Sequence, residues 1–386
     1  MTIWIIEPRD PLIVRDGRPF GPAPGARAAS LPFPFPSTTT GGVRTLDGLD
    51  ADGRFQISEI PRIKQIRVCG PLLVELDIAT GDIVQWLLPP PGDALLLDAD
   101  LPDPNSAILK RLVPLQLPPQ ASTNLPSGFS LVGMPKQDRR KPYGRAPRYW
   151  NWRHQFEQWL LNPQDREVAL TDVGHSGPVS EERMHVRIQR ETQTAAEEGA
   201  LFQTRGLEFT RTENRTRLAL AVSTDAPNLK AGIAPLGGER RLVSWRRSSE
   251  SLPSCSSALR DSIVNHGHCR LVLLTPACFL SGLRPSWLIN QREGVTPSLL
   301  AVANSRPQVV SGWDFERAPQ GPKPTRRLAP AGTTLFLKLD GDEASIEKWI
   351  STTWMHCVSD EEQDRRDGFG LAVLGAWDGS VQPIEV

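Results

Sequence analysis

The stretch RRDGFGLAVLG at residues 365–375 decides the fold. Two glycines enclose a phenylalanine, and an apolar run typical of a strand leads to a third glycine, Gly375. This third glycine lies too far along for the G-x-G-x-x-G loop of a dinucleotide-binding fold. A phosphate-binding P-loop would need Gly-Lys followed by Ser or Thr, which the sequence lacks. The stretch therefore predicts a glycine loop that opens directly into a buried strand.

The sequence of residues 365–375 is more similar to RNP1, the RNA-binding strand of RRM domains, than to either of these loops. It differs because Asp367 replaces a basic residue and aliphatic residues stand where base-stacking rings would lie. Two interpretations stay open. In the first, Gly368 and Gly370 let backbone N–H groups approach phosphates, while Arg365 and Arg366 supply charge. In the second, the loop is a tight turn with two solvated arginines.

Proline governs the expected architecture, since the chain has 36 prolines among 386 residues. Proline cannot donate to a sheet ladder or sit inside a helix, so the elements must be short. Strand patterns occur at residues 3–6, 63–76 (broken at Gly70-Pro71), 86–97 (a hairpin), 217–222, 270–275, 335–339 and 371–377, and helix patterns at 149–161, 256–265 and 344–352, with a helix start at 36–38. This mixture predicts an α+β fold of two ferredoxin-like β-α-β-β-α-β units, with domains at 1–225 and 226–386.

Charge is balanced overall but not locally. The 44 basic and 44 acidic residues cancel, which argues mildly against a free-standing protein that coats nucleic acid. Residues 101–160, however, hold 9 Lys/Arg against 3 Asp/Glu, which suits a subunit that meets RNA on one face. This segment predicts a phosphate-binding thumb at about 101–150, with an ordinary solvated surface as the alternative. Its densest run of cations is Lys136, Arg139, Arg140, Lys141, Arg145 and Arg148.

The sequence offers little for metal, cofactor or covalent chemistry. Its five cysteines are scattered without C-x-x-C spacing, so reduced thiols are expected rather than zinc or disulfides. The one close histidine pair, His266-x-His268, lacks further ligands at metal-binding spacing. No apolar run approaches the ~20 residues that cross a bilayer, and no secretory leader is recognised. We therefore expect a cytoplasmic protein with no metal, cofactor or membrane contact.

Short blocks along the chain carry a family resemblance. The blocks are EPRDPL (7–12), DGRPF (16–20), PST (36–38) with Gly41, His185 with TA (194–195), EGALF (198–202), LGGER (236–240), SGWD (311–314), KPTRR (323–327) and PAG (330–332). With the glycine loop they resemble the RAMP superfamily of CRISPR proteins, and within it the branch that forms the third subunit of the Cmr (type III-B) effector complex. Any one block is weak, but the ordered set spans residues 3–377 and is specific. Residues 101–150 match least well.

The resemblance implies two fused ferredoxin-like domains with a protruding thumb. It also implies partners: the 5′ repeat-derived tag of the CRISPR RNA (crRNA), the large polymerase/cyclase-like subunit and a backbone RAMP subunit, with target RNA nearby. Members of this branch are not known for nuclease activity, because target cleavage belongs to the neighbouring backbone subunits. We therefore expect a non-catalytic subunit that holds the 5′ tag and docks the large subunit onto the backbone.

The candidate RNA-contacting residues combine cations with the loop glycines. They are Arg9, Arg15, Arg18, Lys136, Arg139, Arg140, Lys141, Arg145, His185, Arg187, Lys323, Arg326, Arg327, Arg365, Arg366, Gly368, Gly370 and Gly375. Two alternatives remain. His185 could be the general base of a RAMP endoribonuclease that matures the guide, although the sequence shows no partner for it. The chain could also bridge proteins only, with incidental RNA contacts.

Overall fold

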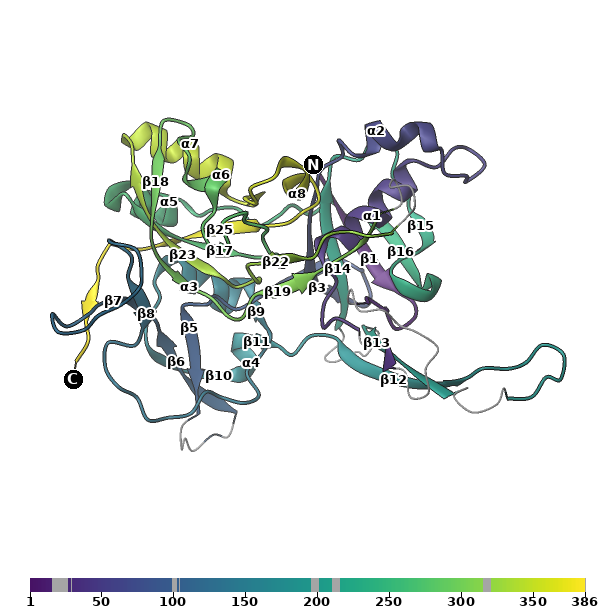
Figure 1. Cartoon of the computed structure of the whole chain (residues 1–386), viewed down its shortest axis with the longest axis horizontal. Coiled ribbons are helices and arrows are strands. Elements are labelled where there is room, and N and C mark those ends of the chain that lie inside the picture. The colour runs from purple at the N-terminus through teal and green to yellow at the C-terminus, as the bar shows by residue number, and fades with distance from the viewer. Residues whose placement is uncertain are drawn as a thin grey trace.

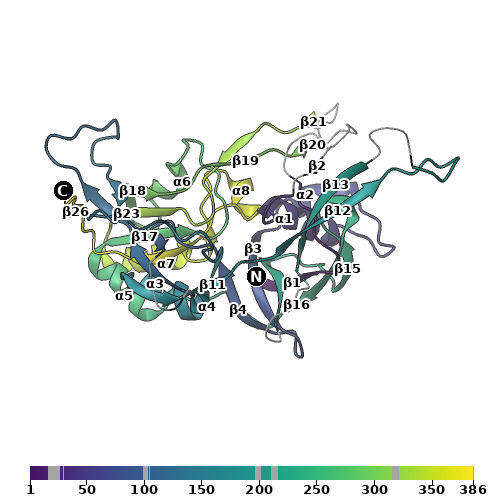
Figure 2. The ribbon, with the colours of Figure 1, turned by 90° about the horizontal axis from the view of Figure 1, so that it is seen from below.

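The computed structural model describes residues 1–15, 27–28, 30–98, 103, 105–195, 201–209, 216–314 and 321–385. Figure 1 shows two lobes, one around strands of the N-terminal half and the other around strands of the C-terminal half. A hairpin of β12 (Val179–Val186) and β13 (Leu201–Glu208) projects beyond both lobes in Figure 1 and in Figure 2. Within the described ranges no helix has both the length and the apolar character needed to cross a membrane.

The first lobe contains an eight-stranded sheet in which all neighbours pair antiparallel. In order across the sheet, the strands are β11 (Gly174–His175), β9 (Tyr149–Asn151), β4 (Ile83–Leu88), β3 (Val68–Asp77), β14 (Thr216–Thr224), β1 (Thr2–Pro8), β16 (Leu242–Arg247) and β15 (Gly232–Pro235). The side chains of β1 alternate between the faces: Trp4 and Ile6 pack with Val43 on one side, and Ile3 and Ile5 pack on the other.

A helix covers one face of this sheet. The helices of the first lobe are α1 (Pro36–Asp47), η1 (Ile57–Glu59), α2 (Ile60–Ile63) and the turn η3 (Gly238–Arg240). Proline in the first turn of α1 loses no hydrogen bond, and Phe35 occupies its N-cap. A Cβ on Gly42 would lie 2.8 Å from Leu236 Cδ1 and 3.1 Å from the Trp245 ring, so glycine permits the close contact of helix and sheet.

The second lobe contains a five-stranded antiparallel sheet with helices on it. Its strands, in order, are β18 (Thr296–Ala303), β23 (Thr334–Asp340), β17 (His268–Leu273), β25 (Leu371–Ala376) and β24 (His356–Cys357). Its helices are α5 (Ser257–His266), α6 (Ser286–Ile289), α7 (Glu343–Thr353) and α8 (Glu362–Arg366), joined by η2 (Trp152–Phe156), α3 (Glu157–Leu161) and α4 (Leu170–Val173) from the first half of the chain. Ser256 and Asp342 cap the N-termini of α5 and α7 with their side chains, which satisfies one orphan N–H each.

The remaining strands form small sheets. These are β10 (Arg166–Ala169), β6 (Ser106–Arg111) and β5 (Ala94–Leu97); β12, β13 and β2 (Arg27–Ala28); β26 (Gln382–Pro383), β7 (Val113–Gln116) and β8 (Leu131–Gly133); β19 (Gln308–Val310) with β22 (Arg326–Leu328); and β20 (Trp313–Asp314) with β21 (Gly321–Pro322). They line the edges of the lobes and connect them.

One hydrophobic cluster runs through both lobes. Ile5 and Val74 of the first sheet belong to the same buried cluster as Leu271 and Leu335 of the second sheet. Because the apolar core is continuous, the lobes pack as one unit, and the junction between them is the natural place for a site.

The structure differs from the sequence-based expectations in several places. The expected break at Gly70-Pro71 lies inside one strand, β3, because these two residues form a bulge opposite Val222 of β14 and the pairing resumes on either side. The expected hairpin at 86–97 is two strands of different sheets, β4 and β5. The boundary expected near residue 225 falls between strands of one sheet, since β15 and β16 join β1.

The segment expected to form the thumb is also arranged differently. Ala107, Leu109 and Val113 are buried in strands, which ties much of residues 105–150 to the body of the protein. The projecting element is instead the β12–β13 hairpin, on which Met184 and Leu201 are more than half exposed. Burial of apolar residues in the first segment, and their exposure in the second, explains which of the two stands free.

Candidate nucleic-acid interface

The glycine loop lies inside the protein, where the two lobes meet. Gly368, Phe369 and Gly370 are all buried. Their backbone N–H groups donate to Arg365 O (3.3 Å), Asp364 O (3.0 Å) and Pro276 O (2.8 Å), in that order. Since these donors already have acceptors, a phosphate could not use them without breaking the loop. Of the two interpretations, the tight turn is the one found in the structure.

The loop glycines are needed for close packing. Gly368 has a φ of +91°, and a Cβ there would lie 2.7 Å from Gly70 O and 2.8 Å from Val68 O on β3. Gly370 has a φ of +84°, and a Cβ there would lie 2.9 Å from Ser359 N. At both positions a residue other than glycine would have a strained backbone conformation, and its Cβ would clash with neighbouring backbone atoms. The loop presses the C-terminal strand region against the first sheet.

The third glycine makes room for a buried cation. Gly375 lies within β25, and a Cβ there would lie 2.9 Å from Arg270 Nη2. Arg270 is fully buried and pairs with Asp93 at 2.5 Å, which joins the second sheet to the segment between β4 and β5. The structure thus gives all three glycines a packing role in place of the RNA contact expected from the letters.

The arginines of the loop are bound within the protein. Arg365 Nη1 donates to the carbonyls of Ser359 and Asp360, at 2.6 Å each, and burial lowers the pKa of its guanidinium. Arg366 pairs with Glu362 at 2.5 Å. These contacts stabilise the turn that precedes β25, so neither guanidinium is a free anchor for a phosphate.

The basic run of residues 136–148 is exposed. Arg139, Lys141 and Arg145 have no ion-pair partner among the described residues, whereas Arg140 pairs with Asp138 at 2.5 Å. Lys136 is 81% exposed and lies 4.0 Å from Glu385, the limit of an ion pair. The run therefore presents several uncompensated positive charges to solvent, which is the property expected of a phosphate-binding surface.

The structure adds two cations that the sequence did not suggest. Lys110 and Arg111 of β6 line a hollow of about 370 Å³ together with Lys136, Arg139 and Arg140. Five cations and two carboxylates, Asp138 and Asp165, thus face one volume. The cations of β6 and those of residues 136–140 are about 25 residues apart in the chain, so the sequence does not show that they form one group. The antiparallel pairing of β7 with β8 brings them together.

Three groups of this hollow have shifted pKa values, and one of them is Arg140, whose pKa is raised by its hydrogen bond to Asp138. Burial, followed by the nearby Arg270, lowers the pKa of Arg111, and its Nε is a buried donor with no partner among the described residues. Hydrogen bonds from the Arg140 side chain and backbone lower the pKa of Asp138 to about 2. The shift at Arg111 therefore reflects mainly its burial, and the shift at Asp138 reflects its local pairing with Arg140.

The N-terminal arginines lie near the start of the hairpin region. Arg9 is exposed directly after β1, and Arg15 pairs with Glu239 at 3.3 Å, beside η3. Arg18 lies outside the described residues. The bridge between Leu12 and Leu207 places this N-terminal stretch against the base of β13.

His185 lies on the projecting hairpin. Its ring stacks on Phe202 with centroids 5.1 Å apart, and its Nε2 lies 2.9 Å from Thr204 Oγ1. Neither partner is a carboxylate that would orient a general base or stabilise its protonated form. Arg187, two residues further on, is exposed.

The last basic patch is divided between a structural and a solvent-facing part. Arg326 pairs with Asp364 at 2.5 Å and lies over the Phe369 ring, 5.4 Å from its centroid, so it supports the glycine loop. Lys323 and Arg327 are exposed. Of the candidates in this region, these two remain available to a partner.

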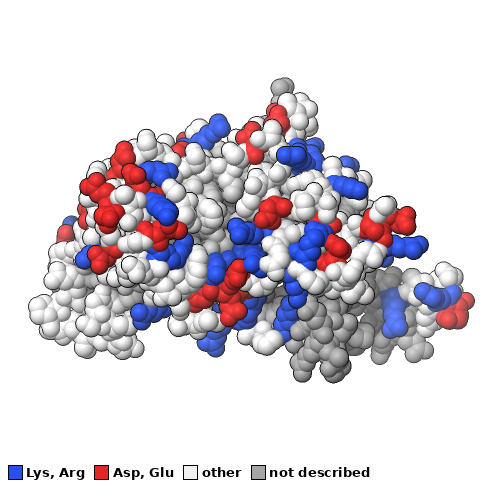
Figure 3. Space-filling view, turned by 90° about the horizontal axis from the view of Figure 1, so that it is seen from above, with Lys and Arg blue, Asp and Glu red and all other residues white. Residues whose placement is uncertain are grey.

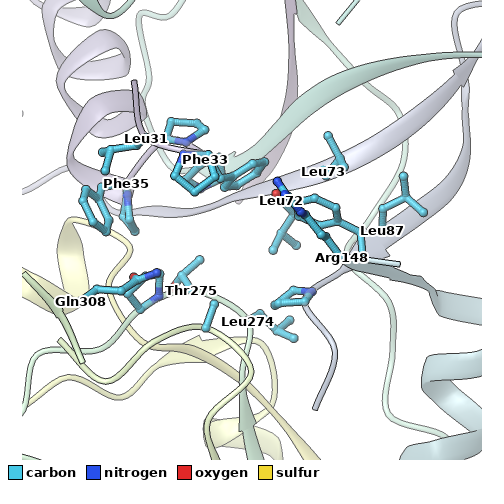
Figure 4. Close-up of a pocket in the computed structure, with 18 residues that line it drawn as sticks. Leu31, Phe33, Phe35, Leu72, Leu73, Leu87, Arg148, Leu274, Thr275 and Gln308 are labelled. Atoms are coloured by element: carbon cyan, nitrogen blue, oxygen red, sulfur yellow. The ribbon is translucent and has the colours of Figure 1, made fainter. Parts of the chain in front are cut away.

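A largely apolar pocket of about 370 Å³ opens at the junction of the lobes. Figure 4 shows Leu31, Phe33 and Phe35 on one wall, with Leu274, Thr275 and Gln308 across from them. Arg148, the last cation of the basic run, lies at its edge. No local pattern in the sequence indicates this pocket, because its walls come from seven separate segments.

Basic and acidic side chains are interspersed on the face that Figure 3 shows, in keeping with the zero net charge. On this face, positive character is therefore confined to small groups of side chains. Among the residues that the structure describes, no three His, Cys, Asp or Glu side chains gather as a metal site would require.

Comparisons with known proteins identify the family. The family described as "CRISPR-associated protein (Cas_Cmr3)" matches residues 4–377. A chain of the Type III-B Cmr-beta complex bound to cognate target RNA and AMPPnP is similar with 16% identity and a TM-score of 0.46, over 87% of this chain and 86% of that chain. A chain of the Csm3-Csm4 subcomplex of the type III-A interference complex is similar with 11% identity and a TM-score of 0.34, over 89% and 94%. A comparison with curated proteins found no match. The family match covers nearly the whole sequence, so this chain belongs to the Cas_Cmr3 family of CRISPR-associated proteins.

Proposed function

We propose that this chain is a non-catalytic, RNA-binding subunit of a type III-B (Cmr) effector complex. In this role it holds the 5′ tag of the crRNA and docks the large polymerase/cyclase-like subunit onto the backbone RAMP subunits, near the target RNA. Membership of the Cas_Cmr3 family supports the assignment to a CRISPR complex. The two sheets with their helices would be its two ferredoxin-like units, and the β12–β13 hairpin its thumb.

One observation carries the RNA-binding part of the proposal. Residues 136–145 expose Arg139, Lys141 and Arg145 without acidic partners in the described part of the chain, and Arg139 shares a hollow with four more cations. Clustered exposed cations without acidic partners create a local positive field that attracts an anion, and the phosphate backbone is the anion that an RNA-guided particle supplies. The face with mixed charge in Figure 3 suits contacts with protein subunits.

Charge reversal in the assembled complex tests this role. Arg139→Glu/Lys141→Glu changes two exposed, unpaired cations, and the expected result is loss of crRNA from the purified complex as salt is raised. Lys230→Glu/Arg247→Glu is the matched control, because it makes the same charge change at two exposed positions elsewhere. If both double variants retain crRNA equally at every salt concentration, the chain is a protein bridge, and the proposal fails.

The non-catalytic part has its own test. His185 contacts a ring and a hydroxyl, and no carboxylate hydrogen-bonds to it in the described residues. We expect the purified protein to leave repeat RNA uncut in the absence of metal. Site-specific cleavage that disappears in His185→Ala, but persists in His175→Ala, would instead show an endoribonuclease that matures the guide.

A further inference from the structure

The pocket at the junction of the lobes has walls that exclude most ligands. Six of its eighteen lining residues are prolines, which have no N–H to offer, and most of the others are aliphatic or aromatic. A bare phosphate would find few donors there, whereas a flat, weakly polar group would replace water favourably. Its volume of about 370 Å³ is in the range of small-molecule sites.

Aromatic faces line one side of the pocket. Phe33 and Phe35 alternate with prolines in the segment that leads into α1, and Tyr149 lies beside Phe33 with ring centroids 5.5 Å apart. Gly177 leaves room for the Tyr149 ring, since a Cβ there would lie 2.4 Å from it. Rings held in this way offer flat surfaces for stacking, and every nucleobase has a matching face.

One polar group in the pocket lacks a partner. Gln308 lines the wall opposite Phe33, and its Oε1 is buried without a hydrogen-bond donor in the described residues. A buried acceptor left unpaired is unfavourable, so a donor that reached it from the pocket would be stabilised. A ligand with an N–H edge would satisfy it, and glutamine side chains pair with base edges in this way.

The edge of the pocket carries a single positive charge. Arg148 is exposed and has no ion-pair partner among the described residues. It ends the basic run that begins at the hollow, so a nucleic-acid strand that follows the run would reach this edge. A ligand that joins flat apolar faces, an N–H edge and an adjacent anion is a nucleotide. An apolar side chain of a partner protein has neither the edge nor the charge.

We propose that this pocket binds one base of a single-stranded RNA, stacked against Phe33, with Gln308 accepting a hydrogen bond from the base edge and Arg148 contacting its phosphate. This inference deepens the proposed function and rests on it, because it assigns a base-binding site to the RNA-binding subunit. In this proposal the base binds at the lobe junction, and the glycine loop does not contact the RNA. The loop instead supports the pocket wall, because Thr275 of that wall donates a hydrogen bond to Gly368 O and Pro276 lies beside it.

Mononucleotide binding to the full chain tests the pocket without requiring the other subunits. AMP, GMP, CMP and UMP are titrated by NMR saturation transfer, with ribose 5-phosphate as the ligand that lacks a base. We expect at least one nucleotide to bind and ribose 5-phosphate to fail. Phe33→Ala should weaken binding by about 5- to 100-fold, the range of lost base stacking, and Gln308→Leu should weaken it in a base-dependent way.

Controls keep the result interpretable if a core variant folds poorly. Arg148→Ala is a surface change that should leave folding intact and weaken nucleotide binding, whereas Arg247→Ala, also exposed but outside the pocket, should not weaken it. Gln120→Leu, at an exposed glutamine, is the control for Gln308→Leu. Equal binding of ribose 5-phosphate and AMP, or no binding of any nucleotide at millimolar concentration, would overturn the inference.

The assembled complex separates this inference from the proposed function. A photo-reactive residue in place of Leu31 should crosslink to RNA, and crosslinks to protein alone would show that a partner side chain fills the pocket. If crRNA retention depends on Arg139 and Lys141 while nucleotides ignore the pocket, only the inference fails. If nucleotides bind but charge reversal leaves crRNA in place, the proposed function fails instead.

Discussion

The buried ion pair between Arg270 and Asp93 should be a main link between the lobes. Both side chains are fully buried, with Nη1 and Oδ2 2.5 Å apart. Arg270 also donates to the carbonyls of Ala376, Trp159 and Leu160, at 2.7–3.0 Å. Every nitrogen of the guanidinium therefore has an acceptor, and the charge has no route to solvent.

Removing one partner leaves the other charge buried and unpaired. Asp93→Asn keeps the shape of the side chain but removes its charge, and it should lower the free energy of unfolding by about 3–5 kcal/mol. Arg270→Met leaves the carboxylate with only Trp159 Nε1 (3.2 Å) and Thr334 Oγ1 (3.4 Å), for a similar cost of about 3–5 kcal/mol. The double variant removes both charges, so its cost should fall short of the sum by ~2 kcal/mol or more.

Urea unfolding monitored by tryptophan fluorescence would measure these free-energy changes. Thermal unfolding monitored by calorimetry would test whether the two lobes unfold together in a single transition. Arg205→Met is the control, since its pair with Glu182 is about half exposed and should contribute only about 0–1 kcal/mol. The difference between Asp93→Asn and Arg205→Met should persist at high salt, because a buried pair is poorly screened. If the two variants are equally stable, the pair is not the desolvated link that the geometry indicates.

Three further expectations concern other parts of the chain. Gly368→Ala should lower the melting temperature more than Gly53→Ala, because both have positive φ but only the first meets the β3 backbone; equal shifts would contradict the packing role of the loop. The Asp138 carboxyl should titrate at about 2 by NMR, so the stabilisation by its contact with Arg140 is complete above the ordinary aspartate pKa and is lost as pH falls through about 2; Arg140→Ala should return the titration toward the ordinary value. Burial raises the pKa of Cys255 to about 11, so its alkylation should quicken roughly tenfold per pH unit from 8 to 10, with Cys255→Ser as the control; a plateau near pH 9 would show an ordinary thiol.

Local patterns predicted many of the elements. The apolar run at residues 3–6 is β1, the pattern at 256–265 is α5, and that at 344–352 is α7. These segments have strong periodicity and, in the two helices, side-chain N-caps, so the signal is within the segment itself. The family suggested by the ordered blocks and the α+β character suggested by the mixed strand and helix patterns are confirmed.

What failed depended on partners that are distant in the chain. The Gly70-Pro71 pair signals a break, but the strand continues because β3 accommodates the pair as a bulge against β14. The hairpin expected at 86–97 pairs its second half with β6 instead. The cations of β6 and the pocket residue Gln308 gave no sequence signal, since their grouping depends on how strands assemble.

The glycine loop shows why a motif can be recognised correctly and yet interpreted wrongly at the level of contacts. Glycine at positive φ signals that something approaches the backbone closely, but the letters do not say whether that neighbour is a phosphate or another backbone. Here it is the carbonyl of Gly70, from a strand nearly 300 residues earlier. A family signature in this place therefore preserves the junction of the lobes, and through it the pocket wall that Thr275 and Pro276 form. It follows that substitutions in the glycine loop should weaken RNA binding only when they destabilise the junction of the lobes. Substitutions of the exposed cations at residues 136–148 should weaken RNA binding while the fold stays unchanged.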